Sequence, residues 1–230
     1  MRLDRFLTRR GVHSGKEVAR LLADDRVQVD GEVENSGLRK ISRFCRVELD
    51  GEVLQEQEAI YLMLHKPAGY LSATTDPLHP TVIELIDHPL RGDLHLAGRL
   101  DRASTGLLLL TNDGRWSKLV TEPVEEIPKV YRVRTRDGIA PETAAIFAAG
   151  IYFAYEDLTT RPAVLEVLGE REALLTIHEG RYHQVKRMFH AVGNQVLGLH
   201  RESIGPLGLD GLTPGMSRRL TGEEVALFRR

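Results

Sequence analysis

The chain has 230 residues, of which 42% are hydrophobic, and its formal net charge is −2. This length allows one ordinary domain and a small second one, and the near-neutral charge excludes a protein that is basic throughout, so any nucleic-acid surface must be local. Cys45 is the one cysteine of the sequence, which excludes an internal disulfide and a cysteine-rich zinc site. The sequence has no signal peptide and no run of the about 18 apolar residues that a membrane span needs, so we expect a cytoplasmic protein without membrane contact.

Residues 1–58 are predicted to form a small module of two short helices and two hairpins. The first helix has apolar residues at helical spacing, at Leu3, Phe6 and Leu7. The second follows Ser14, whose spacing to Glu17 is that of a capping box. Alternating residues around Asp-Gly pairs predict hairpins with type I′ turns, at residues 30–31 and 50–51.

Basic side chains are concentrated on these two predicted helices, at Arg2, Arg5, Arg9, Arg10, Lys16 and Arg20. Such charges usually form a solvated helix surface. Beside a small hairpin sheet, however, they give a module that resembles the S4 RNA-binding domain. The residues that carry this resemblance are Arg2, Leu3, Asp4, Phe6, Leu7, Gly11, Ser14, Val27, Val29 and Gly31. The resemblance implies RNA binding by these six basic residues, through phosphate contact and shape.

The acidic residues 50–60 are interpreted as a junction, and residues 59–230 as a second, larger domain. Strands are expected at Ile60–Leu64, Val130–Arg134, Val164–Val167 and Ala173–Ile177. Helices are expected at Pro141–Ala149, ended by Gly150, and after the capping pair Thr221 and Glu224. Strands with interspersed helices, in no strict βαβ order, predict an α+β domain around one mixed or antiparallel sheet.

Asp101 is the leading candidate for chemistry, because it lies between two runs of core-like residues, where a carboxylate needs partners. Gly98 and Gly106 bracket it and permit a sharp backbone excursion. Arg99 and Arg102 could keep the carboxylate ionised. A structural aspartate that caps a turn or pairs with an arginine explains the same local pattern, since ion-pair networks often look like this.

Residues 179–194 are predicted to include an amphipathic helix. Its apolar positions are Val185, Met188, Phe189 and Val192, and its polar positions are His183, Lys186, Arg187 and His190. No acid occurs from Gly180 to Arg201, whereas Arg181, Lys186, Arg187 and Arg201 are basic. The helix is therefore either a solvated amphipathic helix or a surface that faces phosphate.

Tyr131 lies in a predicted strand, next to basic residues. Most tyrosines in strands only pack, but in an RNA enzyme an aromatic ring beside cations can stack a base taken out of its helix. The Lys66-Pro67 turn leaves the same two alternatives open. The sequence contains no phosphate-binding glycine loop, no dinucleotide fingerprint and no metal-ligand spacing among its histidines, so we expect neither cofactor nor metal.

Taken together, these segments resemble the RsuA branch of the pseudouridine synthases. The matching segments are Gly98–Asp113, the lysine, proline and glycine at 66, 67 and 69, the pair Lys129 and Tyr131, and the helix from Arg181 to Met188. The resemblance implies that Asp101 is the catalytic carboxylate, that Lys186 is its basic partner, and that Tyr131 stacks on the flipped uracil. RNA contacts are implied at Lys66, Arg99, Lys129, Arg181, His183, Gln184 and Arg187, with Lys66 and Arg99 contacting either phosphate or the loop itself.

Within the branch, the resemblance is strongest to enzymes that act on 16S rRNA, conventionally at uridine 516. The implied partner is 16S rRNA or a small-subunit assembly intermediate, bound by a monomer. Enzymes acting on 23S rRNA are the nearest alternative. A non-catalytic ribosome-assembly factor would use the same basic surfaces, and a nucleoside hydrolase would also place a carboxylate at an anomeric carbon, although it usually needs a second carboxylate.

Overall fold

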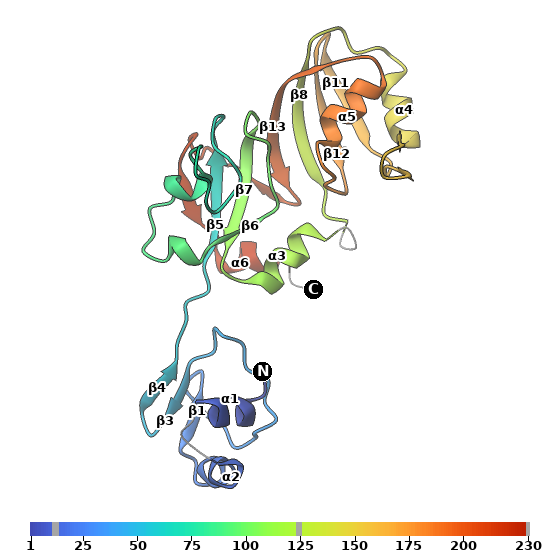
Figure 1. Cartoon of the computed structure of the whole chain (residues 1–230). Coiled ribbons are helices and arrows are strands. Elements are labelled where there is room, and N and C mark those ends of the chain that lie inside the picture. The colour runs from blue at the N-terminus through green and yellow to red at the C-terminus, as the bar shows by residue number, and fades with distance from the viewer. Residues whose placement is uncertain (11–13, 123–125, 229–230) are drawn as a thin grey trace. The chain divides into compact units, whose positions relative to one another are not determined.

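The computed structural model describes residues 1–10, 14–122 and 126–228. These residues divide into two compact units, Met1–Ala59 and Ile60–Arg230 (Figure 1). The boundary lies one residue after the one expected from the sequence. Gly11, which is part of the S4 resemblance, and the end of the predicted last helix, Arg229 and Arg230, lie outside the described residues.

The first unit is a small helix pair and hairpin sheet, as the sequence predicts. Its helices are α1 (Leu3–Arg9) and α2 (Gly15–Ala23), and its strands are β1 (Val27–Val29), β2 (Glu32–Val33), β3 (Val47–Leu49) and β4 (Glu52–Gln55), in the sheet order β2-β1-β3-β4. The capping box of Ser14 and Glu17 is present at the start of α2. Both Asp-Gly pairs have positive φ at both residues, as a type I′ turn requires. Because β4 occupies part of the predicted junction, the residues without regular structure before the second unit are only 56–60 among those described.

The second unit is built around one large sheet. Its strands are β5 (Tyr61–Lys66), β6 (His95–Ala97), β7 (Thr105–Thr111), β8 (Lys129–Thr135), β9 (Tyr152–Phe153), β10 (Leu158–Thr159), β11 (Val164–Gly169), β12 (Glu172–Ile177), β13 (Val196–Ile204), β14 (Leu207–Gly208) and β15 (Ser217–Arg219). Its helices are η1 (Val82–Leu85), η2 (Arg91–Asp93), α3 (Gly114–Thr121), α4 (Thr143–Ala149), α5 (Gln184–Ala191) and α6 (Gly222–Ala226). In the described part of the chain the main sheet has the order β11-β12-β8-β13-β7-β5-β15, with β14 beside β13 and β6 beside β7, while β9 and β10 pair separately.

This architecture confirms the α+β class and the predicted strands. Two helix boundaries differ from the prediction. Helix α4 begins at Thr143 rather than Pro141, and Gly150, with φ of +84°, follows its last residue. Helix α6 starts after the capping box of Thr221 and Glu224 and ends at Ala226. Among the described residues, no helix is both long enough and apolar enough to cross a bilayer.

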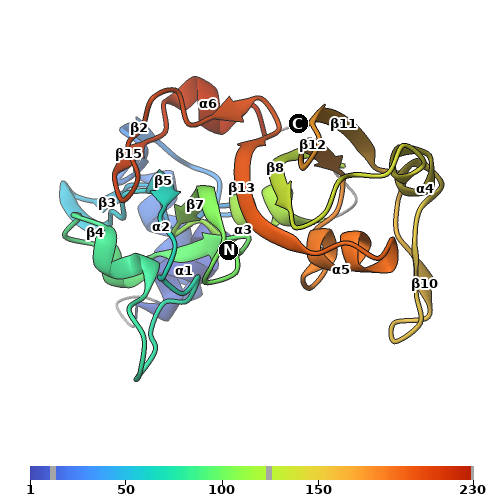
Figure 2. The same cartoon turned by 90° about the horizontal axis from the view of Figure 1, so that it is seen from above.

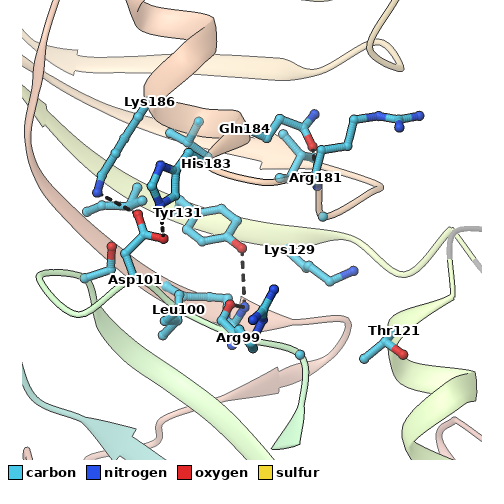
Figure 3. A pocket seen from close by; sticks show the side chains of 17 residues that line it. Arg99, Leu100, Asp101, Thr121, Lys129, Tyr131, Arg181, His183, Gln184 and Lys186 are labelled. Carbon is cyan, nitrogen blue, oxygen red and sulfur yellow. Dashed lines mark hydrogen bonds and ion pairs between the residues drawn. The ribbon is translucent and has the colours of Figure 1, made fainter. Parts of the chain in front are cut away.

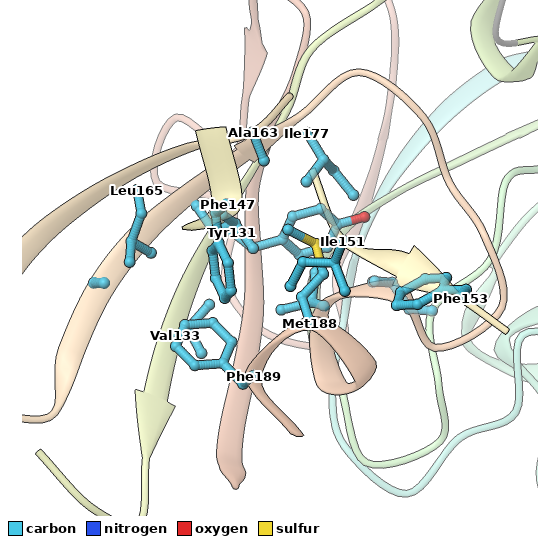
Figure 4. Close-up of a cluster of buried hydrophobic side chains, with 14 residues drawn as sticks. Tyr131, Val133, Phe147, Ile151, Phe153, Ala163, Leu165, Ile177, Met188 and Phe189 are labelled. Carbon is cyan, nitrogen blue, oxygen red and sulfur yellow. The ribbon is translucent and has the colours of Figure 1, made fainter. Parts of the chain in front are cut away.

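Two groups of strands bury separate hydrophobic cores. Strands β8, β11 and β12 pack against α4 and α5, through side chains that include Tyr131, Phe147 and Phe189 (Figure 4). Strand β7 is buried on both faces, because its consecutive leucines alternate between two cores: Leu107 and Leu109 pack with α3 and α6, and Leu108 and Leu110 pack with β5 and η1. The leucine run thus forms a central strand of the sheet.

Strand β13 joins the two groups of strands, because it pairs with β8 on one side and with β7 on the other (Figure 2). Its pairing with β7 is parallel, and matches His200 with Thr105 and Arg201 with Gly106. Its pairing with β8 is antiparallel, and the register shifts between Arg201 and Ser203. The loop that carries Asp101 leads directly into β7, so this joint between strand groups positions the candidate site.

Candidate active site

Asp101 is held by two basic side chains of the α5 segment. Its Oδ2 lies 2.6 Å from Lys186 Nζ and its Oδ1 lies 3.0 Å from His183 Nε2, and about a quarter of its side chain remains exposed. Figure 3 shows Lys186 reaching Asp101 from α5 and His183 reaching it from the turn before this helix, with the Tyr131 ring beside them. The basic side chains that contact Asp101 are therefore distant in sequence. Arg102, a neighbour expected to help, donates instead to the Gly69 carbonyl.

The loop before β7 is fixed in place by the last residue of β5. Lys66 is fully buried, and its ammonium donates to the carbonyls of Pro67, Arg102 and Ser104 at 3.0, 3.2 and 2.8 Å. Burial lowers the pKa of this ammonium to about 8, while the Asp101 charge acts in the opposite direction. Of the two contacts considered for Lys66, the structure therefore shows the loop, because a fully buried ammonium is not exposed to a phosphate.

Ser72 makes a second connection to the same loop, which the sequence did not indicate. Its Oγ donates to the Leu100 carbonyl at 2.7 Å and also lies 3.1 Å from the Leu100 amide. This pair of contacts holds the backbone directly before Asp101. A serine among loop residues gives no signal of such a role in the sequence, because its partner is distant along the chain.

The turn before α5 orients the two basic side chains. His183 has a left-handed backbone, with φ of +48°, and α5 begins at Gln184. Gln184 is buried, and its Nε2 donates to Glu179 Oε1 at 2.7 Å. Glu179 also accepts from Arg181 Nε at 2.8 Å. Gln184 thus stabilises this turn, and Lys186, one helical turn after His183, reaches the same carboxylate.

Tyr131 lies on β8 with its ring packed in the core and only 6% of its surface exposed. The ring lines a cavity of about 130 Å³, together with the Asp101 loop and the start of α5. In Figure 3 its hydroxyl points away from Asp101, toward the side where Lys129 lies. The Tyr131 side chain therefore packs in the core and also forms a wall of the cavity beside the Asp101 carboxylate.

Arg201 is the residue of this cavity that the sequence analysis did not select. It lies on β13 with 2% of its surface exposed, and its Nε donates to the Leu107 carbonyl at 2.7 Å. Its Nη1 lies 3.4 Å from the Tyr131 hydroxyl. The sequence marks Arg201 only as one of several basic residues, because its burial depends on the pairing of β13 with both β7 and β8.

The structure separates the predicted RNA contacts of this unit into two groups. Arg99, Lys129, Arg181, His183 and Gln184 line the cavity. Arg187 is already engaged elsewhere: its guanidinium forms a two-point ion pair with Glu156 and lies 3.7 Å from the centre of the Phe153 ring. Its predicted phosphate contact stays a prediction, and RNA would have to compete with Glu156 for this guanidinium.

The basic residues of the first unit differ in how they are engaged. Arg2 pairs with Asp4 and Arg20 with Asp24, Arg9 contacts the Met1 sulfur, and Arg10 lies over the Phe6 ring. Arg5 and Lys16 are exposed and have no acidic partner among the described residues. Of the six basic residues predicted to bind RNA, these two are thus the most available for phosphate.

We expect stability to rise with pH above 8 because of Lys129. Burial, and then the Arg201 charge, lower the pKa of its folded-state ammonium to about 8. An exposed lysine in the unfolded chain titrates near about 10.4, so the unfolded chain binds more protons between these values, and the free energy of unfolding increases through that window. Below pH 8 the Lys129 side chain is protonated in both the folded and the unfolded chain, so it adds no pH dependence to the free energy of unfolding.

Urea unfolding of the wild type and of Lys129→Met, at pH values below and above 8, checks this expectation. The variant should be more stable than the wild type below pH 8, and the difference should shrink as the pH rises toward the unfolded-state value. Lys66 shifts in the same direction and remains in both proteins, so only the Lys129 part of the slope disappears. An equal pH dependence of the free energy of unfolding in the wild type and the variant would contradict the assignment of this effect to Lys129.

The chain matches the family described as RNA pseudouridylate synthase over residues 60–191. It is 51% identical over 227 residues to "Ribosomal small subunit pseudouridine synthase A" of Pseudomonas aeruginosa, covering 98% of this chain and 99% of that protein. The protein of the same name from Escherichia coli K12 is 46% identical over 228 residues, with 98% and 99% covered. A solved structure titled "Crystal structure of pseudouridylate synthase" is 40% identical, has a TM-score of 0.72, and covers 99% of both chains.

Proposed function

The chain belongs to the RNA pseudouridylate synthase family and is a pseudouridine synthase; on this premise we propose that its substrate is one specific uridine of 16S rRNA, conventionally uridine 516. Two full-length relatives carry the name of a small-subunit enzyme, which supports 16S rRNA or a small-subunit assembly intermediate as the partner. The observation that carries the catalytic part of the proposal is the Asp101 carboxylate, held by Lys186 and His183 at the cavity lined by Tyr131.

The reaction breaks the N1–C1′ glycosidic bond, turns the uracil, and joins C5 to C1′, so no atom is lost. In the proposal the uridine leaves its helix and its base stacks on the Tyr131 ring. Asp101 then acts on the sugar, either as the nucleophile at C1′ or as the base that removes the C2′ proton. Lys186 and His183 fix the direction of the carboxylate in both routes.

The composition of the cavity disfavours simple hydrolysis of a nucleoside. A glycosidase usually pairs one carboxylate with a second, acidic one. Among the described residues that line this cavity, Asp101 is the only acid. The cavity therefore supports isomerisation by one carboxylate.

Incubation with rRNA tests the substrate. Transcripts of 16S and 23S rRNA, each with and without the proteins of its subunit, are incubated with the enzyme, and pseudouridines are mapped by carbodiimide labelling and primer extension. One new modification in the 16S transcript or its particle is expected. Modification in 23S rRNA alone would keep the reaction and overturn the 16S assignment. Binding without modification would favour an assembly factor.

We expect Tyr131→Phe to lose turnover far more than RNA affinity. Phenylalanine keeps the ring that stacks on the base but removes the hydroxyl, which lies 3.4 Å from Arg201 Nη1. Loss of a group that takes part in proton transfer or charge stabilisation typically costs about 10²-fold in rate. Single-turnover rates and dissociation constants measure the two effects. Tyr155→Phe, at a side chain that is 96% exposed, is the control, and a defect mainly in affinity would limit Tyr131 to docking.

We expect the first unit to contribute to the salt dependence of RNA binding through its exposed cations. The combined variant Arg5→Gln, Arg9→Gln and Lys16→Gln should lower the slope of log Kobs against log salt by about 2 to 3, because each phosphate contact contributes about 0.7 to 0.9. Filter binding at several salt concentrations measures the slope. Arg26→Gln is the control, since this exposed arginine pairs with Asp50. An unchanged slope in the combined variant would count against RNA binding by these residues.

A further inference from the structure

Two buried cations line the cavity on the side of Tyr131 where its hydroxyl lies. Arg201 is opposite Tyr131 in the pairing of β13 with β8, and Lys129 lies two residues before Tyr131 on β8. Both line the cavity, and they are 2% and 9% exposed. Figure 3 places Lys129 on the side of Tyr131 that faces away from Asp101. The cavity therefore has a carboxylate on one side of Tyr131 and positive charge on the other.

Arg201 has an unused hydrogen-bond donor. Its Nε donates to the Leu107 carbonyl, and its Nη1 lies within 3.5 Å of both the Arg99 carbonyl and the Tyr131 hydroxyl. Its Nη2 is buried and has no hydrogen-bond partner among the described residues. Arginine has five N–H donors and stays protonated in proteins, so this side chain presents both a charge and a free donor.

No carboxylate among the described residues pairs with Arg201. The acid of the cavity, Asp101, is engaged by Lys186 and His183. A second buried cation nearby makes the imbalance larger, and burial together with the Arg201 charge lowers the pKa of Lys129 to about 8. An uncompensated buried charge is costly, so such an arrangement fits a ligand that brings negative charge to this side of the cavity.

We propose that Arg201 is a catalytic residue that stabilises the negative charge of the uracil as it leaves C1′. This inference rests on the proposed function, which puts C1′ at Asp101 and the base on the Tyr131 ring. The edge of the base opposite N1 then faces the Tyr131 hydroxyl and the Arg201 guanidinium. A donor aimed at charge that develops only during the reaction lowers the barrier more than it tightens binding.

The electron balance closes without a further reactant. When the N1–C1′ bond breaks, its electron pair stays on N1 and is delocalised onto O2 and O4, where a guanidinium can donate to it. When C5 bonds to C1′, the electron pair forms the new C5–C1′ bond, and either the Asp101–C1′ ester bond breaks or, in the elimination route, Asp101 returns the proton to C2′. C5 then loses its proton and N1 gains one, so the protons also balance. The assignment holds for both routes open to Asp101, because each produces the same uracil anion.

The test compares two leaving groups in one variant. RNAs carrying uridine or 5-fluorouridine at the target position are used, because the fluorinated base is more acidic and needs less help to leave. Arg201→Gln should slow glycosidic bond loss from uridine by about 10²-fold, as expected for loss of one charge-stabilising donor. Its deficit on 5-fluorouridine should be smaller. RNA affinity, measured in the Asp101→Asn background to prevent turnover, should change little.

The comparison remains informative if the variant folds poorly, since a loss of folded protein lowers both rates equally and leaves their ratio unchanged. Arg201→Lys, which keeps the charge but loses the forked donor, should have an intermediate deficit. Arg134→Gln is the control, because Arg134 is an exposed arginine on β8, the strand that pairs with the β13 strand of Arg201. Equal deficits on both RNAs, or a loss of affinity alone as for a phosphate contact, would overturn the inference. Turnover by the wild type separately tests the proposed function.

Discussion

Asp101→Asn is expected to lower pseudouridine formation by about 10³-fold, since a general base typically contributes about 10²–10⁴-fold and a nucleophile is required for its covalent route. The amide is nearly isosteric with the carboxylate but is neutral, so it can neither attack C1′ nor accept a proton from C2′. The fold should be retained, because the side chain is about a quarter exposed and the loop is fixed through backbone contacts to Lys66 and Ser72. Quantification of pseudouridine after single-turnover incubation measures the loss.

The control for this change is Asp87→Asn, at an exposed aspartate of the same unit. It should leave the rate unaltered. Thermal unfolding and RNA affinity of Asp101→Asn should stay near the wild-type values, which would attribute the loss to chemistry. Substantial turnover by a pure Asp101→Asn protein would remove Asp101 from the mechanism while leaving the family assignment intact.

Gly106→Ala is expected to destabilise the second unit by about 3–5 kcal/mol, which is the range for severe overpacking combined with backbone strain. Gly106 has φ of +111°, a conformation that residues with a Cβ rarely adopt. An added Cβ would lie 2.3 Å from the Arg201 carbonyl oxygen and 2.5 Å from its amide nitrogen. These atoms are backbone, so relief requires β13 to move away from β7.

Denaturant unfolding measures this cost. Gly114→Ala is the matched control, because a Cβ at Gly114 meets nothing within 4 Å, and its stability should stay close to the wild type. Gly106→Ala should also lose activity even where it remains folded, since the same joint carries Asp101 and Arg201. A Gly106→Ala protein with wild-type stability would show that the close approach of β7 and β13 is not required.

Much of the local structure follows from the sequence alone. The capping boxes at Ser14 and Thr221 are present, and the type I′ turns form at their Asp-Gly pairs. Val185, Met188 and Phe189 of α5 are buried as the helical spacing predicts, while Val192, directly after the helix, is half-buried. These features depend on backbone preferences and on partners within a few residues, so the sequence is sufficient to locate them.

The sequence also singles out Asp101, because a carboxylate between two apolar runs needs an explanation. Its partners could not be found in the same way. The local sequence points to the neighbours Arg99 and Arg102, and Lys186 was implied only by the family resemblance. The contacts come from His183 and Lys186, more than eighty residues later in the chain. Periodicity shows that these two side chains share a helix face, but not what that face contacts.

The tertiary structure decided how deeply each charged side chain is buried and which partners it has. A lysine that the sequence suggested for phosphate, Lys66, is buried under the loop it holds, and Arg187 forms an ion pair with Glu156. Arg201 becomes a buried cation of the cavity because β13 pairs with both β7 and β8, which lie far from β13 in the sequence. The free energy of a charged side chain depends on burial and on its partners within a few ångströms, and the packing of distant segments sets both.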